Sequence, residues 1–173
     1  IEVRDARTFL DKHHIQGANR LSLDAWGLFH GGELVGVMTL GRHSRQGVEA
    51  DTAVLDRLCF KSNVRVVGGA SKLLAAASKW ACRYGYRRII SFSDNRLSCG
   101  RVYEAMGFRH DETLPIDYFY VEAGNPLRYH SKQSQQKAAT GCPAHITERE
   151  WAAMHGLVQV CDAGKKRWEF ELR

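Results

Sequence analysis

The sequence predicts a mixed α/β fold, in which helices cover the faces of a mostly antiparallel β-sheet. Three observations lead to this prediction. Gly31-Gly32 joins two apolar runs and is typical of a β-hairpin turn. Residues 54–84 form a strand-like run, a glycine turn and a helical pattern in succession. Residues 88–106 repeat that succession with a shorter helix, so strands and helices alternate after the opening hairpin.

The first elements are a helix and the hairpin. Residues 5–14 carry apolar side chains at helical spacing, which predicts a first helix with one buried face. The apolar runs 25–30 and 33–40 are the two strands on either side of Gly31-Gly32. The segment between the first helix and the hairpin reads as a loop.

The following elements build the rest of the sheet. Residues 54–60 and 88–93 read as strands, and residues 99–106 as a short helix. We expect the aromatic run 118–121 to pair with the segment that follows this short helix. The longer helix, 71–84, places several apolar residues on one face, which should pack on the sheet: Leu73, Leu74, Ala77, Trp80 and Ala81.

The turn between the strand and the longer helix is suited to binding an anion. Gly68 and Gly69 have no Cβ, so a phosphate can approach the backbone closely. The N-terminus of a helix also presents free N–H groups and the positive end of the helix dipole. The same pattern is compatible with an ordinary tight turn, so the residues alone leave both interpretations open.

The composition is that of a folded domain with a basic surface. A chain of 173 residues, 44% of them hydrophobic, is long enough to bury a core. The net charge of +6 favours a polyanionic partner such as DNA or RNA, or reflects a basic surface exposed to solvent. No apolar run approaches the roughly 20 residues that cross a bilayer, so no membrane partner is expected. Five cysteines without a Cys-x-x-Cys pair predict a reducing cytoplasm and no metal site.

The character of the sequence changes after residue 123, which predicts a main domain at 1–123 and a basic appendage at 124–173. The appendage contains a helix start with a capping-box pattern at 147–150. Residues 157–161 and 167–172 alternate around a turn and read as a hairpin. About fifty residues are too few for an independent core, so we expect a small C-terminal α+β appendage docked on the main domain.

Two short motifs occur in a fixed order around the two later helices. They are Arg65-x-x-Gly68-x-Ala70 and Tyr103-x-x-x-Gly107-Phe108. Their order and spacing, within residues 21–121, resemble the GNAT superfamily of acyl-CoA-dependent N-acyltransferases. The resemblance implies a GNAT fold, acetyl-CoA or another acyl-CoA as cofactor, and an amine as acceptor. It also implies that the cofactor's pyrophosphate lies on the glycine turn, at Arg65, Val67, Gly68, Gly69, Ala70 and Ser71.

A narrower resemblance concerns phage proteins. The chain is similar to GNAT-like phage proteins labelled as C-terminal regions of Hef-type homing endonucleases. More distantly, it is similar to the Mom family, phage GNAT-fold proteins that modify adenine in DNA. In Mom-type sequences, an arginine in a Leu-x-Arg-Leu strand and an aspartate at a strand end are important for function, and Arg57 and Asp94 match them. The Mom pattern also has Gly-His before its tyrosine, whereas no histidine precedes Tyr103 in that place. The resemblance implies a phage-encoded protein acting in the host cytoplasm.

Four residues are candidates for catalysis. The resemblance places Tyr103 where GNAT enzymes often carry the acid that protonates the leaving thiolate; otherwise it is a packing residue. Asp94 orients or deprotonates an amine, or it caps the helix that follows. Arg57, in an apolar strand, needs a partner, for which Asp94 is a candidate by position, or it binds an anionic group of the acceptor. His14 lies in the loop that borders the acceptor site in GNATs, where it serves as a base or is a surface residue.

Several basic and aromatic residues are candidates for contacts with nucleic acid. They are Arg42, Arg45, Arg128, Tyr129 and Lys132. The main hypothesis is an N-acyltransferase whose acceptor amine lies on nucleic acid, for instance a modified DNA base. The alternatives are a Mom-like, metal-dependent base-modifying enzyme without ordinary CoA chemistry, a non-catalytic nucleic-acid-binding module, and a toxin that acetylates aminoacyl-tRNA. The sequence leaves the acyl group and the oligomeric state open.

Overall fold

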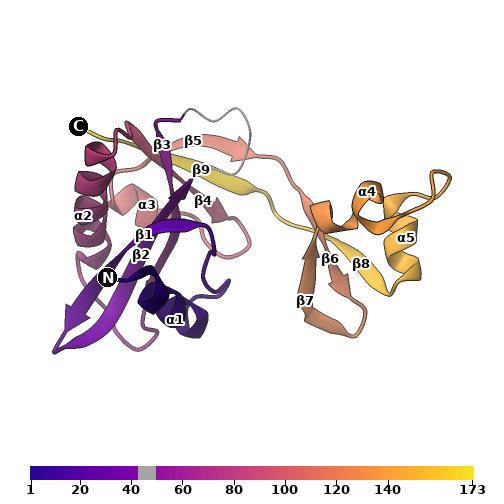
Figure 1. Cartoon of the computed structure of the whole chain (residues 1–173), viewed down its shortest axis with the longest axis horizontal. Coiled ribbons are helices and arrows are strands. Elements are labelled where there is room, and N and C mark those ends of the chain that lie inside the picture. The colour runs from indigo at the N-terminus through magenta and orange to yellow at the C-terminus, as the bar shows by residue number, and fades with distance from the viewer. Residues whose placement is uncertain (43–49) are drawn as a thin grey trace. The chain divides into compact units, whose positions relative to one another are not determined.

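A computed structural model describes residues 1–42 and 50–173, with the side chains of 126–129 outside that description (Figure 1). The chain forms two compact units. The first consists of residues 1–93, 100–112 and 166–173, and the second of residues 94–99 and 113–165.

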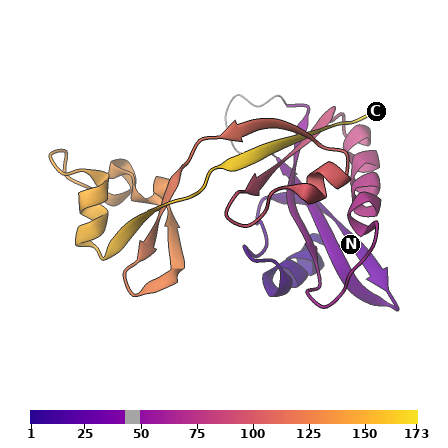
Figure 2. The same ribbon diagram turned by 180° about the vertical axis from the view of Figure 1, so that it is seen from behind.

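A six-stranded sheet with the order β1-β2-β3-β4-β9-β5 organises the first unit. Its strands are β1 (Ser22–His30), β2 (Glu33–Arg42), β3 (Thr52–Phe60), β4 (Arg88–Asp94), β5 (Arg109–Leu114) and β9 (Lys165–Glu171). The pairs β1–β2 and β2–β3 are antiparallel, whereas β3–β4 is parallel. Figure 2 shows β9 lying beside β5 in this sheet. The predicted mixed, mostly antiparallel α/β fold is confirmed.

The hairpin turn is the one predicted. Gly31 and Gly32 connect β1 to β2, and both adopt positive φ angles of 57° and 80°. A two-residue turn of this kind matches the right-handed twist of its strands, and glycine adopts it without a steric penalty.

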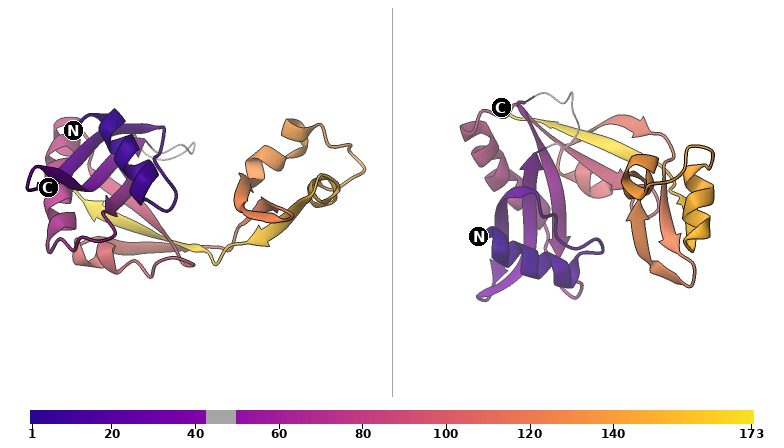
Figure 3. Two further views of the ribbon diagram at one scale, coloured as in Figure 1. Left: turned by 90° about the horizontal axis from the view of Figure 1, so that it is seen from below. Right: turned by 45° about the vertical axis from the view of Figure 1, so that its right-hand side comes forward.

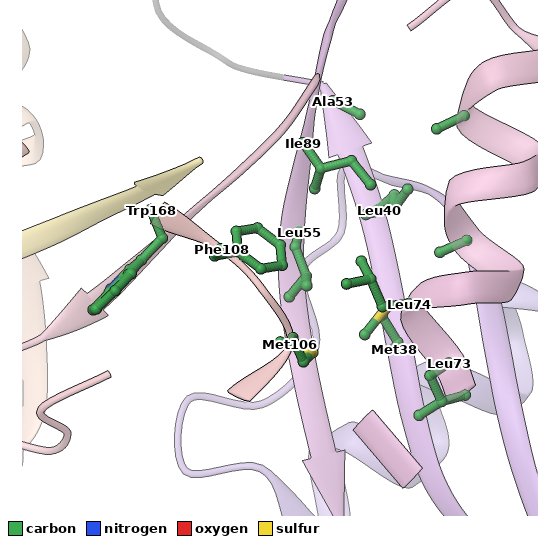
Figure 4. Packing of buried hydrophobic residues seen from close by; sticks show 12 residues of the cluster. Met38, Leu40, Ala53, Leu55, Leu73, Leu74, Ile89, Met106, Phe108 and Trp168 are labelled. Carbon is green, nitrogen blue, oxygen red and sulfur yellow. The ribbon is translucent and has the colours of Figure 1, made fainter. Parts of the chain in front are cut away.

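Helices cover both faces of this sheet, as Figures 1 and 3 show for α1 (Val3–His13) and α2 (Gly69–Arg83). On one face, Phe9 and Leu10 of α1 pack with Val37 of β2. The neighbouring β2 residues Met38 and Leu40 point to the opposite face, since side chains alternate along a strand. Figure 4 shows the core on that face, where α2, the segment after α3 (Arg101–Ala105) and β9 pack with β2, β3 and β4. The residues are Met38, Leu40, Ala53, Leu55, Leu73, Leu74, Ile89, Met106, Phe108 and Trp168.

The two central strands separate halfway along their length. In the parallel pairing of β3 with β4, Thr52 lies opposite Arg88, Ala53 opposite Ile89 and Val54 opposite Ile90. Beyond Val54 and Ile90, these two described strands do not pair with each other. Both strands nevertheless continue, β3 to Phe60 and β4 to Asp94. A gap in the backbone ladder therefore opens at the middle of the sheet.

The second unit has its own three-stranded sheet, in the order β7-β6-β8. Its elements are β6 (Tyr118–Glu122), β7 (Asn125–Ser131), η1 (Lys132–Gln135), α4 (Lys137–Thr140), α5 (Glu148–Met154) and β8 (Leu157–Cys161). The predicted capping box is present, since the Thr147 side chain accepts from Glu150 N–H and the Glu150 carboxylate accepts from Thr147 N–H.

Two predicted strand pairings are wrong. Residues 118–121 pair with β7 and β8 rather than with the segment after α3, and β8 and β9 belong to different sheets instead of forming a hairpin. The reason is that β9 fits between β4 and β5 of the main sheet. Residues 115–164 are consequently an insertion before the last strand, and the structure divides the chain elsewhere than at residue 123.

No helix in residues 1–42 and 50–173 is long and apolar enough to cross a membrane.

Candidate active site

The gap between β3 and β4 is bridged by side chains. The Ser91 hydroxyl, on β4, donates to the Leu55 carbonyl of β3 at 2.9 Å. The Tyr103 hydroxyl of α3 lies 2.9 Å from Ser91 Oγ and 3.5 Å from the Phe92 carbonyl. Because the Leu55 carbonyl can only accept, the Ser91 proton is committed there, and Tyr103 is the donor toward Ser91. The Tyr103 O–H thus lies at the point where the two strands part.

The Tyr103 ring is held on two sides. It stacks on Trp168 of β9, with ring centroids 5.6 Å apart and planes 20° apart, and meets Phe108 edge-on at 5.6 Å. Burial raises the pKa of the Tyr103 hydroxyl, against a smaller lowering effect of the Arg57 charge. The phenol therefore keeps its proton at neutral pH.

Arg57 connects the same site to the loop after α1. Its Nε donates to the Gly17 carbonyl at 2.9 Å, and Nη1 donates to the Asp56 carbonyl at 2.8 Å. Partial burial lowers the pKa of His14, and the Arg57 charge lowers it further. Gly17 N–H in turn donates to the His14 carbonyl at 2.9 Å, so Arg57 is bonded to the turn that follows His14.

His14 has a defined orientation. Its Nδ1 accepts a hydrogen bond from Gln16 N–H at 3.1 Å. In the neutral ring the proton is then on Nε2, so this nitrogen is a hydrogen-bond donor. A role as base would require this bond to Gln16 to break.

Asp56 is a residue that the sequence reasoning missed. The β2–β3 register shifts where Thr39 opposes Arg57 and Leu40 opposes Leu55, so Asp56 is the extra residue of a β-bulge. Burial raises the pKa of its carboxyl group, although hydrogen bonds from Asn19 and Ser22 lower it. A carboxylate inside an apolar strand was the available signal.

Asp94 has a local partner. Its carboxylate forms a bidentate pair with Arg96, with Nη2–Oδ2 and Nε–Oδ1 distances of 2.6 and 3.0 Å, and accepts from Arg96 N–H. The Arg96 hydrogen bonds lower the pKa of Asp94. Leu97 and Ser98 N–H donate to the Asp94 carbonyl, so this residue also closes the turn after β4. Arg57 and Asp94 thus each have other partners than the predicted pairing with one another.

The glycine turn has the geometry of an anion site. Gly68, the N-cap of α2, adopts φ 71°, and a Cβ built there would meet nothing within 4 Å. Gly69 is different, because its Cβ would lie 2.9 Å from both Phe60 and Val66. No side chain caps this described helix and its first turn holds no acidic residue. Arg65, Val67 and Ser71 are exposed around it, and Ala70 is half-buried.

A cavity of about 940 Å³ begins at Ser71. One wall is α2, through Leu74, Ser78 and Lys79, and another is the segment after α3, at Met106 and Gly107. The C-terminal strand completes it with the residues 169–173. The cavity therefore follows α2 from Ser71 to Cys82, beside the segment after α3.

The residues predicted to contact nucleic acid differ in their exposure and in their partners. Arg42 is exposed at the end of β2, and Arg45 lies outside the described residues. The backbone of Arg128 and Tyr129 is in β7, while their side chains lie outside the description. Lys132 forms an ion pair with Asp117 at 2.7 Å, which reduces its availability for a phosphate. Within the described part of the chain, no three His, Cys, Asp or Glu side chains gather to hold a metal ion.

Comparison with solved structures defines the class of fold. An acetyltransferase from Bacillus subtilis in complex with CoA aligns at a TM-score of 0.55 and 16% identity, covering 100% of this chain and 95% of the other. The ribosomal-protein-S18-alanine N-acetyltransferase of Escherichia coli aligns at a TM-score of 0.54 and 11% identity, covering 99% of this chain and 90% of the other. The IAA acetyltransferase of Bacillus cereus aligns at a TM-score of 0.50 and 19% identity, covering 86% of this chain and 77% of the other. The chain has the GNAT acetyltransferase fold.

The family follows from the sequence match. Residues 1–164 match the Mom protein family, and the chain belongs to this family. No curated protein sequence matches the chain.

Proposed function

We propose that the chain is a GNAT-type N-acyltransferase that takes an acyl group from acyl-CoA, acetyl-CoA in the simplest case, and transfers it to an amine of a DNA base. The observation that carries the proposal is the gap beyond Val54–Ile90, with the Tyr103 hydroxyl at its apex and Arg57 and His14 beside it. A donor bound on the α2 side and an acceptor bound on the α1 side would meet in this gap.

The α2 side fits a nucleotide-derived thioester. The N-terminus of α2 has no side-chain cap and presents the positive end of the helix dipole, which suits a pyrophosphate. Arg65 adds a positive charge, and Gly68 leaves the approach open. The cavity that begins at Ser71 has the size expected for a cofactor site. The residues present therefore fit CoA, as the names of the solved neighbours suggest.

In the reaction, a C–N bond to the amine forms and the C–S bond of the thioester breaks. The thioester supplies the activated acyl group. Tyr103 holds a proton at neutral pH that can pass to the leaving sulfur. His14, with its proton on Nε2, orients the acceptor by donating to it, and the proton released by the amine leaves to solvent. Arg57 holds the acceptor loop and adds a positive charge for an anionic acceptor.

The choice of DNA as acceptor has two supports. Membership of the Mom family is the first, since the resemblance described above implies adenine in DNA. The distribution of charge is the second. The second unit holds six Lys and Arg and six Asp and Glu, so the net charge of +6 belongs to the first unit, which contains the gap. A cationic surface around a site favours a polyanionic substrate.

A second candidate is favoured by one contact. Because the Tyr103 O–H is directed to Ser91 within the sheet, it is equally suited to fixing the gap as to protonating a thiolate. The chain would then modify the base by a Mom-type reaction that does not use CoA. The two candidates share the acceptor and differ in the donor.

Calorimetric titration with acetyl-CoA, and separately with CoA, distinguishes them. We expect both to bind, and Gly68→Ala to weaken binding by about 1.4 kcal/mol, or about tenfold, because its Cβ would project into the approach to α2. The matched variant Gly69→Ala places its Cβ against Phe60 and Val66, so it should lower stability instead. Absence of binding by the wild type would move the proposal to the second candidate.

The pH dependence tests the role of His14. Burial and Arg57 hold the pKa of His14 below 6.5, so the folded protein binds fewer protons than the unfolded chain just below that pH. The contribution of neutral His14 to the free energy of unfolding is therefore fully present above pH 6.5. It is lost as the pH falls through the lowered pKa. Protonation of Nδ1 breaks the bond from Gln16 N–H that orients the ring, so we expect kcat/KM for transfer to follow the same acid limb, and His14→Ala to remove it. A limb that is centred at or above pH 6.5 would contradict the assignment.

A further inference from the structure

The loop between α1 and β1 exposes two large aliphatic side chains next to the proposed acceptor site. Ile15 is 76% exposed and Leu21 is 67% exposed, although both are residues that usually avoid water. Ile15 follows His14 directly, and Leu21 precedes Ser22, whose hydroxyl lies 3.2 Å from the Asp56 carboxylate. The two aliphatic residues therefore flank the segment that Arg57 fastens.

The loop is held in place rather than left free. Arg57 donates to the Gly17 carbonyl, and Ala18 N–H donates to Asp11 Oδ1 at 2.9 Å. Arg7 Nη2 donates to the Arg20 carbonyl at 2.9 Å. The Ser22 hydroxyl donates to the Asn19 carbonyl at 3.1 Å. Contacts to α1, β1 and β3 thus fix the backbone on both sides of the exposed residues, so their exposure is a property of a preorganised loop.

Three arginines lie at or next to the end of this loop that carries Leu21. Arg20 directly precedes Leu21 and is exposed, and the Arg7 side chain donates to the Arg20 carbonyl. Ser22 pairs with Gly41, so the exposed Arg42 at the end of β2 lies beside the start of β1. None of these three arginines has a carboxylate within 4 Å among the described residues. An apolar tip with arginines around it is suited to a phosphodiester backbone and the base stack inside it.

We propose that Ile15 and Leu21 form a wedge that enters the base stack of duplex DNA and supports extrusion of the acceptor base into the gap between β3 and β4. The inference rests on the DNA acceptor of the proposed function, and it holds for either donor. An amino group of a paired base is inaccessible to a site of this kind until the nucleotide leaves the stack. Aliphatic side chains that replace the lost stacking lower the cost of that step, and Arg7, Arg20 and Arg42 hold the flanking phosphates.

The first experiment measures extrusion directly. A DNA duplex with 2-aminopurine in place of one adenine becomes more fluorescent when that base leaves the stack. A set of duplexes that places the probe in varied sequence contexts is titrated with the wild-type chain, Ile15→Ala and Leu21→Ala. Phe29→Ala is the control, because Phe29 is also exposed (57%) but lies at the far end of β1. We expect the signal with the wild type and the control, and a loss with both loop variants.

The second experiment separates a wedge from an ordinary contact. Affinity is measured for a fully paired duplex and for one in which the target adenine faces an abasic site and needs no unpairing. The loop variants should bind the paired duplex about tenfold more weakly, the effect of withdrawing about two buried methylene groups, and the abasic duplex as the wild type does. Equal losses of affinity for both duplexes, or no loss for either, would overturn the proposed wedge.

These outcomes are separable from those of the proposed function. If the loop variants extrude the base normally and acyl transfer occurs, the wedge fails while the function stands. If the wild type extrudes the base but binds no CoA, the wedge stands with the second candidate. A wild type that binds no duplex would overturn both the DNA acceptor and the wedge, without affecting a measured affinity for CoA.

Discussion

Replacing Tyr103 with phenylalanine should lower kcat for acyl transfer by about 10²–10⁴, the range over which a positioned acid contributes. The change removes only the hydroxyl, so the ring can keep its stacking on Trp168 and its edge contact with Phe108. Ser91 retains its bond to the Leu55 carbonyl. Stability should therefore fall by only about 1 kcal/mol, the usual net contribution of a hydrogen bond.

Steady-state transfer of labelled acetyl to DNA, together with acetyl-CoA titration, checks this prediction. Affinity for acetyl-CoA should be unchanged, since Tyr103 is separate from the α2 N-terminus. Ser91→Ala is a useful companion, because it frees the Tyr103 hydroxyl from its acceptor while leaving the phenol in place. Unchanged kcat in Tyr103→Phe would make Tyr103 a packing residue that fixes the gap, and would favour the candidate that does not use CoA.

Gly100→Ala should have the largest effect on stability. Gly100 precedes α3 with φ 87°, and a Cβ there would lie 2.1 Å from the ring of Trp168. Trp168 is fully buried, and its indole N–H donates to Ser93 Oγ at 2.9 Å, so it cannot move aside without losing that bond. Overpacking of about 1–3 kcal/mol and a left-handed residue at about 1–2 kcal/mol together predict a loss of about 2–5 kcal/mol.

Gly85→Ala is the matched control for that variant. Gly85 has a similar φ of 81°, but a Cβ there would meet nothing within 4 Å. Urea unfolding of the two variants therefore separates the cost of the left-handed backbone, present in both, from the collision with Trp168, present in one. Equal midpoints for the two variants would show that the indole yields, and that Tyr103 is less firmly supported than the stacking indicates.

The elements that the sequence predicted correctly are those that depend on nearby residues. The Gly31-Gly32 turn, the apolar face of α2 and the Thr147–Glu150 capping box each need only residues within a few positions of one another. Such features follow from steric and hydrogen-bonding rules that act along the chain. Their positions agree with the structure to within a few residues.

The pairings that could not be predicted join distant segments. Residues 157–161 and 167–172 both alternate like strands and are separated by a turn, which makes a hairpin the simplest local interpretation. Alternation specifies which face of a strand is buried but not which strand lies beside it. The buried Trp168 was the relevant signal, because a residue of that size requires the large core of the main sheet.

The candidate site likewise combines residues that the sequence indicated with features that it could not indicate. The motifs, through their resemblance to a known superfamily, indicated Tyr103, Arg57 and His14; in the structure Tyr103 lies at the gap, and Arg57 is bonded to the turn that follows His14. The Ser91 bridge, the bulge at Asp56 and the exposure of Ile15 and Leu21 depend on where a backbone bends or where a ladder ends. No periodic pattern encodes these features.

The insertion before the last strand sets the order of events during synthesis. About 50 residues, 115–164, must be made after β5 and before β9, which takes roughly 3–10 s at about 5–20 residues per second. Throughout that interval β4 and β5 lack the strand that belongs between them, and Tyr103 lacks the indole beneath its ring. Until β9 is made, the main sheet therefore stays incomplete between β4 and β5, and the candidate site built around Tyr103 cannot take its final form.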